Sequence, residues 1–168
     1  MKKLISLFLI FILTFSLVSC GENDGYKTIT EGNVTLRLPN TMVKRNVSYA
    51  DVYYSNGDMY LIMMAFSNSR IEEELELYSE ITVSDYVTLY KAWNGYTATA
   101  IYDEERNAVQ FDELTTTVTD GNENYEYEYY LFFRRAGGIY VICLGCDGEL
   151  MEQHEEIFKY IDTTVVVK

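Results

Sequence analysis

The feature that most limits how this chain can fold is the segment "NYEYEYYLFFRR", residues 124–135. Its large apolar side chains fall on every second position, and charged side chains fall in between. One set consists of Tyr125, Tyr127, Tyr129, Leu131 and Phe133, and the other includes Glu126, Glu128 and Arg134. Because successive side chains of a strand point to opposite faces, this period of two predicts a β-strand. The apolar run "IYVICLGC", which follows Gly137-Gly138, predicts another strand.

The rest of the chain predicts further strands and two main helices. Residues 33–39 alternate apolar and polar side chains, and Asn56-Gly57 separates two strand-like runs as a hairpin turn does. The segment "VSDYVTLYKAWNG" predicts a helix with Ser84 as N-cap and Gly95 past its end. Strands are expected in "YTATAIY" and "AVQFDELTTTVT", then a turn at Asp120-Gly121, a helix over residues 148–160 and a short strand in "TTVVV". This order predicts a mostly antiparallel α+β domain.

The N-terminus has the pattern of an export signal. Lys2 and Lys3 precede an apolar run over residues 4–15, which is shorter than the about 20 residues of a membrane-spanning helix. Residues 17–20, "LVSC", resemble the lipobox of bacterial lipoproteins, which implies that Cys20 receives a diacylglycerol. We therefore expect a lipoprotein signal peptide over residues 1–19, a lipidated cysteine and tether over 20–25, and one domain over 26–168. An ordinary signal peptide with an unmodified Cys20 is the alternative.

The charge of the chain excludes some classes of partner. Its formal net charge is -13, and loss of residues 1–19 leaves 11 basic against 26 acidic residues, a net charge of -15. Nucleic acids and anionic lipid headgroups select clustered lysine and arginine, so neither is expected as a partner. Membrane attachment is expected through the lipid alone. The apolar content of 48% is enough for a normal core and argues against a disordered chain.

Three segments resemble the PsbP-like family: "NVTLRLPNTM", "TVSDYVTLYKAWNG", and "YYLFFRRAGGIYVICLGC" leading to "FKYIDTTVVVK". That family includes a photosystem subunit, a Ran-binding nuclear transport regulator and many bacterial lipoproteins of unknown role. The resemblance covers most of residues 26–168 and implies an antiparallel sheet flanked by helices, with binding or assembly roles rather than catalysis. It assigns a function to no residue here. A cystatin-like or NTF2-like helix on a curved sheet is the alternative fold.

Cys143 and Cys146 have the spacing of redox and metal-binding motifs. On a strand, residues three apart lie on opposite faces and about 10 Å apart, whereas a disulfide needs Cα atoms within about 7 Å. We therefore expect Cys143 to pack beside Ile139 and Val141, and Cys146 to end the strand. A turn at Leu144-Gly145 could still bring the two sulfur atoms together as a disulfide.

Other candidate sites lack essential ligands. His154 shares a predicted helix face with Leu150, Ile157, Phe158 and Ile161, which is typical of a residue at the core edge. The segment "DGNENYE", residues 120–126, begins like a calcium loop but has Tyr125 and Leu131 where glycine and glutamate are needed. The carboxylates at 103–105 and at 112–113 resemble exposed charges. We expect no catalytic residue, no metal and no cofactor.

These observations favour a non-enzymatic protein-interaction or assembly module on the extracytoplasmic face of the cell membrane. Its partner would be an unidentified envelope or extracellular protein. Exposed tyrosines are favoured at protein interfaces, and Tyr53, Tyr130 and Tyr140 are the candidate binding surface. The alternative is a carrier of a small apolar ligand or glycan, held in a pocket between sheet and helix.

Overall fold

The computed structural model describes residues 24–73, 77–78, 80–119 and 122–168. Cys20 and the predicted signal peptide lie outside these residues. A large sheet has the strand order β3-β4-β5-β9-β8-β7-β6, and a small sheet has the order β1-β2-β10. The strands are β1 (Tyr26–Glu31), β2 (Val34–Pro39), β3 (Val43–Arg45), β4 (Val52–Ser55), β5 (Met59–Ser67), β6 (Ile101–Asp103), β7 (Ala108–Thr119), β8 (Asn122–Arg135), β9 (Gly138–Asp147) and β10 (Val166–Val167). The helices are α2 (Asn68–Glu73), α3 (Val83–Asn94), the 3-10 turn η1 (Gly148–Leu150) and α4 (Met151–Thr164).

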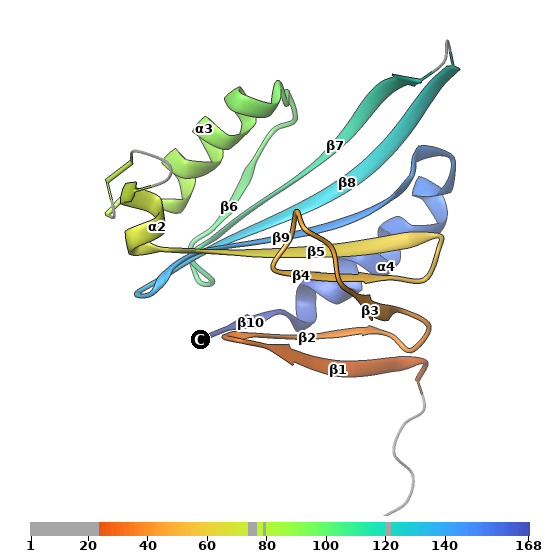
Figure 1. Ribbon diagram of the computed structural model, residues 1–168, viewed down its shortest axis with the longest axis horizontal. Helices are drawn as coiled ribbons and strands as arrows, with labels where there is room; N and C mark the ends of the chain where they lie inside the picture. Colours follow the sequence, from red (N-terminus) through yellow and green to blue (C-terminus); the bar gives the residue numbers. More distant parts are fainter. Residues whose placement is uncertain (1–23, 74–76, 79, 120–121) are drawn as a thin grey trace, which may run out of the picture.

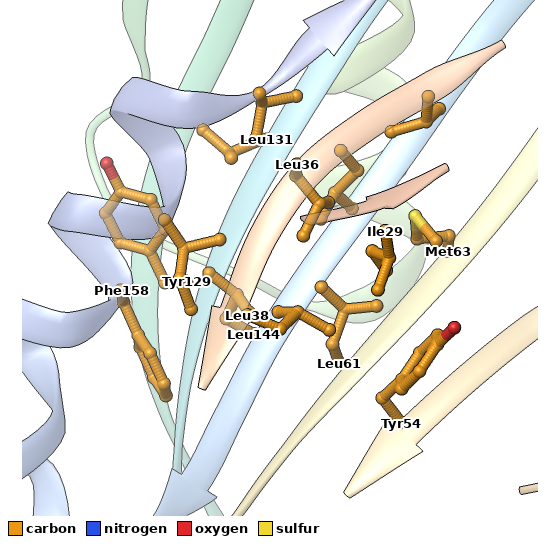
Figure 2. Packing of buried hydrophobic residues seen from close by; sticks show 14 of the residues in the cluster. Ile29, Leu36, Leu38, Tyr54, Leu61, Met63, Tyr129, Leu131, Leu144 and Phe158 are labelled. Atoms are coloured by element: carbon orange, nitrogen blue, oxygen red, sulfur yellow. The ribbon is translucent and has the colours of Figure 1, made fainter. Parts of the chain in front are cut away.

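The large sheet is covered on both faces. Helices α2 and α3 lie on one face, and the small sheet with α4 lies on the other (Figure 1). Figure 2 shows the second of these cores, in which Leu36 and Leu38 of β2 and Phe158 of α4 meet side chains of the large sheet. All three side chains are fully buried. Strands β5, β8 and β9 therefore contribute alternate residues to two separate cores.

The alternation of residues 124–135 is confirmed, but the face that carries the charged residues is more buried than expected. Tyr127, Tyr129, Leu131 and Phe133 share one face, as predicted, and they point into the core beneath the small sheet and α4. On the other face, Tyr130 and Phe132 pack beneath α3 in a core of their own. The pattern showed where the side chains alternate, but it could not show that a helix covers the second face.

The hairpin turn at Asn56-Gly57 and the C-terminal end of α3 agree with the prediction, whereas the helix predicted over 148–160 is a 3-10 turn over Gly148–Leu150 followed by α4 over Met151–Thr164. Gly57 has a φ of 103° in the β4–β5 hairpin, and Gly95 ends α3 with a φ of 72°. Both are left-handed conformations that glycine adopts easily. The turn predicted at Asp120-Gly121 lies outside the described residues, and Thr119 and Asn122 on either side of it pair with each other. The N-cap of α3, however, is Thr82, whose hydroxyl accepts a hydrogen bond from the Asp85 amide; Ser84 was the wrong choice.

The predicted strand over residues 96–102 is largely wrong, because only Ile101–Asp103 pairs as a strand. The carboxylate of Glu113 accepts hydrogen bonds from the amides of Thr97 and Ala98, at 3.0 and 2.9 Å. A side chain therefore takes the place of the neighbouring strand. Strands β1 and β3 were not predicted. Within the part of the chain that the structure describes, no helix is both long enough and apolar enough to cross a membrane.

Candidate functional site: a cleft lined by tyrosines and carboxylates

An open cleft of about 520 Å³ lies where β9 ends at Asp147 and β8 continues past it. We call it the sheet-end cleft. Residues of the β4–β5 hairpin form one side, and residues of β8 and η1 form the other. The side chains that give the cleft its chemistry are three tyrosines and three carboxylates, Tyr53, Tyr60, Tyr125, Asp58, Glu126 and Asp147.

Tyr60 links the cleft to the centre of the sheet. Its ring passes over Gly145 of β9, where a Cβ atom would lie 2.2 Å from the ring carbon Cζ. Only glycine leaves the room for this crossing. The Tyr60 hydroxyl then reaches β8, where Glu126 Oε1 lies at 2.5 Å and Glu128 Oε1 at 3.1 Å. One wall of the cleft is thus held by a hydrogen bond across three strands.

Behind Tyr60, three further groups approach the carboxylate of Glu128, which shares the single hydroxyl proton of Tyr60 with Glu126. The hydroxyls of Tyr130 and Tyr96 donate to Oε2 at 2.9 and 3.1 Å. The Cys143 thiol lies 3.7 Å from Oε1, the same oxygen that Tyr60 approaches. Because the carboxylate is shared among these donors, the network fixes the position of the side chains around it.

The tyrosine hydroxyls and the Cys143 thiol of this network keep their protons, so they serve as hydrogen-bond donors rather than as nucleophiles. Burial and the nearby ionisable groups hold the pKa values of Tyr60 and Tyr130 far above their ordinary value. Burial also raises the pKa of Tyr96 to about 12. Cys143 is buried beside Glu128, and both burial and that charge raise the pKa of its thiol. These groups are therefore protonated at neutral pH and act as donors.

The three tyrosines predicted as a binding surface are separated in the structure. Tyr53 lines the cleft, with its ring stacked on that of Tyr60 at a centroid distance of 6.2 Å. Tyr130 and Tyr140, however, are only 3% and 9% exposed, so the prediction of exposure was wrong for both. Tyr130 lies beneath α3, and the Tyr140 hydroxyl accepts a hydrogen bond from Asn33 Nδ2 at 2.7 Å. The small sheet and α3 cover strand faces that the sequence pattern left open.

The prediction for the two cysteines is confirmed. Cys143 and Cys146 are free, and they lie in the two different cores. Cys143 packs with Ile139 and Val141, as expected. The alternative, a turn at Leu144-Gly145, is wrong because β9 continues through both residues to Asp147.

His154 lies on α4 with its ring stacked on Phe158 at 6.2 Å, and its buried Nδ1 has no hydrogen-bond partner. This position at the core edge agrees with the prediction. Within the described ranges, no group of three or more His, Cys, Asp or Glu side chains is placed to hold a metal ion. Of the possible calcium loop, Asp120 lies outside the described residues, and Asn124 lines the sheet-end cleft.

Sequence reasoning missed most of the cleft, including Tyr60, Asp58, Glu126 and Asp147. One signal was available. A glycine inside a strand of bulky residues often marks a site where another group approaches the backbone closely, and Gly145 is such a glycine. The glycine alone could not have shown which side chain approaches the backbone there, because that depends on the pairing of β5 with β9.

Neither a protein-family model nor a curated protein matches the chain, but solved structures share its fold. The cyanobacterial PsbP protein CyanoP from Synechocystis sp. PCC 6803 has a TM-score of 0.54 at 13% identity, over 89% of this chain and 98% of CyanoP. The Ran-binding protein Mog1p from Saccharomyces cerevisiae has a TM-score of 0.54 at 11% identity, over 84% of this chain and 95% of Mog1p. LpqN from Mycobacterium tuberculosis, involved in cell envelope biogenesis, is a more distant structure, with a TM-score of 0.45 at 9% identity, over 85% of this chain and 90% of LpqN.

The similarities to CyanoP and Mog1p show the fold. The chain has the α+β fold of PsbP and Mog1, as the sequence motifs indicated, rather than the cystatin-like or NTF2-like alternative. At 11–13% identity they show nothing about which residues act.

Proposed function

We propose that the chain is a lipoprotein, anchored through Cys20 on the extracytoplasmic face of the cell membrane, whose domain is a non-catalytic protein-interaction module. The observation that supports an interaction role most directly is the sheet-end cleft, an open and polar site with three tyrosine rings. Tyrosine is enriched at protein interfaces because its ring buries a large area while its hydroxyl still bonds. The anchor rests on the lipobox alone.

The chemistry of the described residues supports a binding role over catalysis. A nucleophilic enzyme needs a nucleophile with a base beside it. The Cys143 thiol is buried, and its pKa is raised rather than lowered. His154, the one histidine of the chain, lies on α4 against Phe158, on the other side of the large sheet from Cys143. The two groups therefore cannot act as a pair.

Carriage of a small apolar ligand has less support. An apolar cavity lies between the β1–β2 turn and strands β4, β5 and β9, lined in part by Val52 and Met63. Its volume of about 200 Å³ is below the roughly 300–1,000 Å³ of typical small-molecule sites. A glycan is the stronger second candidate, because the rings and carboxylates of the sheet-end cleft suit the faces and hydroxyls of a sugar.

The fold is compatible with protein binding. Mog1p, which has the same fold, is a Ran-binding protein. That similarity does not identify a partner for this chain, and the interaction role must be tested directly.

The test is chemical crosslinking of intact cells that express the tagged full-length chain, followed by identification of the linked proteins. Tyr125→Ser, in the cleft, should remove a specific crosslinked species. Tyr102→Ser is the matched control, because Tyr102 is similarly exposed, at 50% against 43%, but lies on the edge strand β6. Equal crosslinking in both variants would contradict the proposal, and a saccharide that copurifies with the wild-type chain would favour the glycan carrier.

A further inference from the structure

The sheet-end cleft carries charge of one sign. Asp58 comes from the β4–β5 turn, Glu126 from β8 and Asp147 from the end of β9, so three separate elements direct a carboxylate to one cavity. Its lining includes no lysine, arginine or histidine among the described residues. A neutral occupant would leave these charges without a counter-charge, whereas a cation would offset them.

The walls of the cleft are aromatic, which narrows the kind of cation. The rings of Tyr53 and Tyr60 stack at an interplanar angle of 19°. Tyr125 is 43% exposed on the opposite side. Tyrosine rings attract organic cations through their faces, but they are not ligands for small metal ions. The combination of rings and carboxylates therefore favours an ammonium or guanidinium group on an apolar stem.

The cleft is already arranged before any ligand enters. The Asn56 side chain accepts hydrogen bonds from the amides of Asp58 and Met59, which fixes the turn that presents Asp58. Tyr60 holds Glu126 at 2.5 Å, and Asp147 Oδ1 caps η1 at the Glu149 amide. Ordering these side chains in advance lowers the entropic cost of binding.

We propose that the sheet-end cleft is a docking site for a lysine or arginine side chain of a partner protein. This inference rests on the interaction role proposed above and adds the chemistry of recognition. The cavity of about 520 Å³ lies in the range of whole ligand sites, so it holds a long basic side chain together with part of the backbone that bears it. Asp58 and Glu126 accept the charged group, and the stem packs on the rings of Tyr53 and Tyr60.

The test is calorimetric titration of the full-length chain, purified in a non-ionic detergent, with a blocked five-residue peptide that contains two lysines. We expect saturable binding of this peptide and none of the same peptide with both lysines acetylated. The variant Asp58→Asn with Glu126→Gln keeps the shape of both side chains and should weaken binding about fivefold or more. The matched control, Glu104→Gln with Glu105→Gln, removes two charges from the exposed β6–β7 turn and should leave binding unchanged.

Several outcomes would overturn the inference. Equal weakening in the control variant would mean that the peptide responds to net charge rather than to the cleft. Binding of the acetylated peptide would remove the requirement for a cation. Spermidine that binds as tightly as the peptide would identify a free polyamine site, and preferential binding of a neutral N-acetylglucosamine oligomer would identify a glycan site.

The interaction role and the basic docking site can be refuted independently of each other. If crosslinking to a partner persists in the Asp58→Asn, Glu126→Gln variant while peptide binding is lost, the interaction role stands and the basic docking site is wrong. If the lysine peptide binds but no crosslinked partner depends on Tyr125, the cation site stands and the interaction role is wrong.

Discussion

At the scale of single residues, the row of side chains that crosses β9 explains why a glycine, Gly145, lies between Cys143 and Cys146. Gly145 pairs with Tyr60 of β5 on one side and with Glu128 of β8 on the other. The Tyr60 ring crosses β9 along this row, and the two cysteines pack on opposite faces of the same strand. The sequence alone gave the positions of the cysteines correctly, but the reason for the glycine required the pairing of three strands.

Gly145→Ala should therefore destabilise the fold. The added methyl group would overlap the Tyr60 ring, and overpacking of this kind costs about 1–3 kcal/mol of unfolding free energy. Gly137→Ala is the control, because its Cβ would meet nothing closer than 3.5 Å. Denaturant titration measures both. On a Tyr60→Leu background Gly145→Ala should cost less, and an undiminished cost there would contradict the clash.

The raised pKa values of the tyrosines around Glu128 predict that the folded chain loses stability at alkaline pH. Their folded pKa values lie above the ordinary value of 10.0, so between pH 10 and about 12 the unfolded chain binds fewer protons than the folded chain. Stability is then fully present below pH 10 and falls as the pH rises above it. Tyrosinate absorbance at 295 nm should show a late step that coincides with loss of the circular dichroism signal. A single step near pH 10, with that signal unchanged, would contradict this account.

At the scale of elements, the sequence predicted strands best where burial follows a simple period. β2 and β8 have such patterns, and the turn at Asn56-Gly57 falls where it was expected. β3 is three exposed residues long and carries no pattern. The segment 97–98 is held by Glu113 instead of by a strand, and no local pattern reveals a distant side chain. The cleft was missed for the same reason, because β5, β8 and β9 meet only in the folded sheet.

Helix α4 is fixed to the large sheet by a buried carboxylate. Asp162 is 7% exposed and pairs with Arg106 at 2.5 Å, and Tyr129 of β8 donates to its other oxygen at 2.9 Å. An acidic residue in the last turn of a helix is unfavourable to the helix itself. Its presence here therefore indicates that the contacts to β8 and to the β6–β7 turn outweigh that cost.

Asp162→Asn should loosen this attachment. The substitution keeps the shape but removes the nearer of the two carboxylates beside Arg106, and only Asp103, at 4.0 Å, remains. We expect a loss of about 2 kcal/mol, less than for a fully buried pair because Arg106 is partly exposed. Glu155→Gln breaks the exposed pair with Lys159 and should leave stability nearly unchanged, because solvent screens that pair. Thermal unfolding of both variants provides the comparison. Similar small losses in both would mean that packing alone holds α4.

At the scale of the whole molecule, the start of the domain lies beside the cleft. The Asn40 amide donates to the Gly25 carbonyl at 2.8 Å, and Thr41 next to it accepts a hydrogen bond from Asn56, at the turn that bears Asp58. Figure 1 shows the beginning of β1 and the β4–β5 turn at the same end of the molecule. Cys20 precedes Gly25 by five residues, a reach of about 17 Å when extended. A lipid on Cys20 would therefore hold the sheet-end cleft close to the membrane surface, within reach of a membrane-bound partner.

The lipid itself can be tested through the three cysteines of the chain. Cys143 and Cys146 are free, so a chain with a thioether on Cys20 should show two thiols in denaturant, whereas an unmodified Cys20 would give three. Cys20→Ala should abolish fatty-acid labelling and release the protein from the membrane fraction, because two acyl chains anchor a protein stably and the tether alone does not. Cys146→Ala is the control and should stay on the membrane. Membrane retention of the Cys20→Ala variant would contradict the anchor and, with it, the placement of the cleft at the membrane surface.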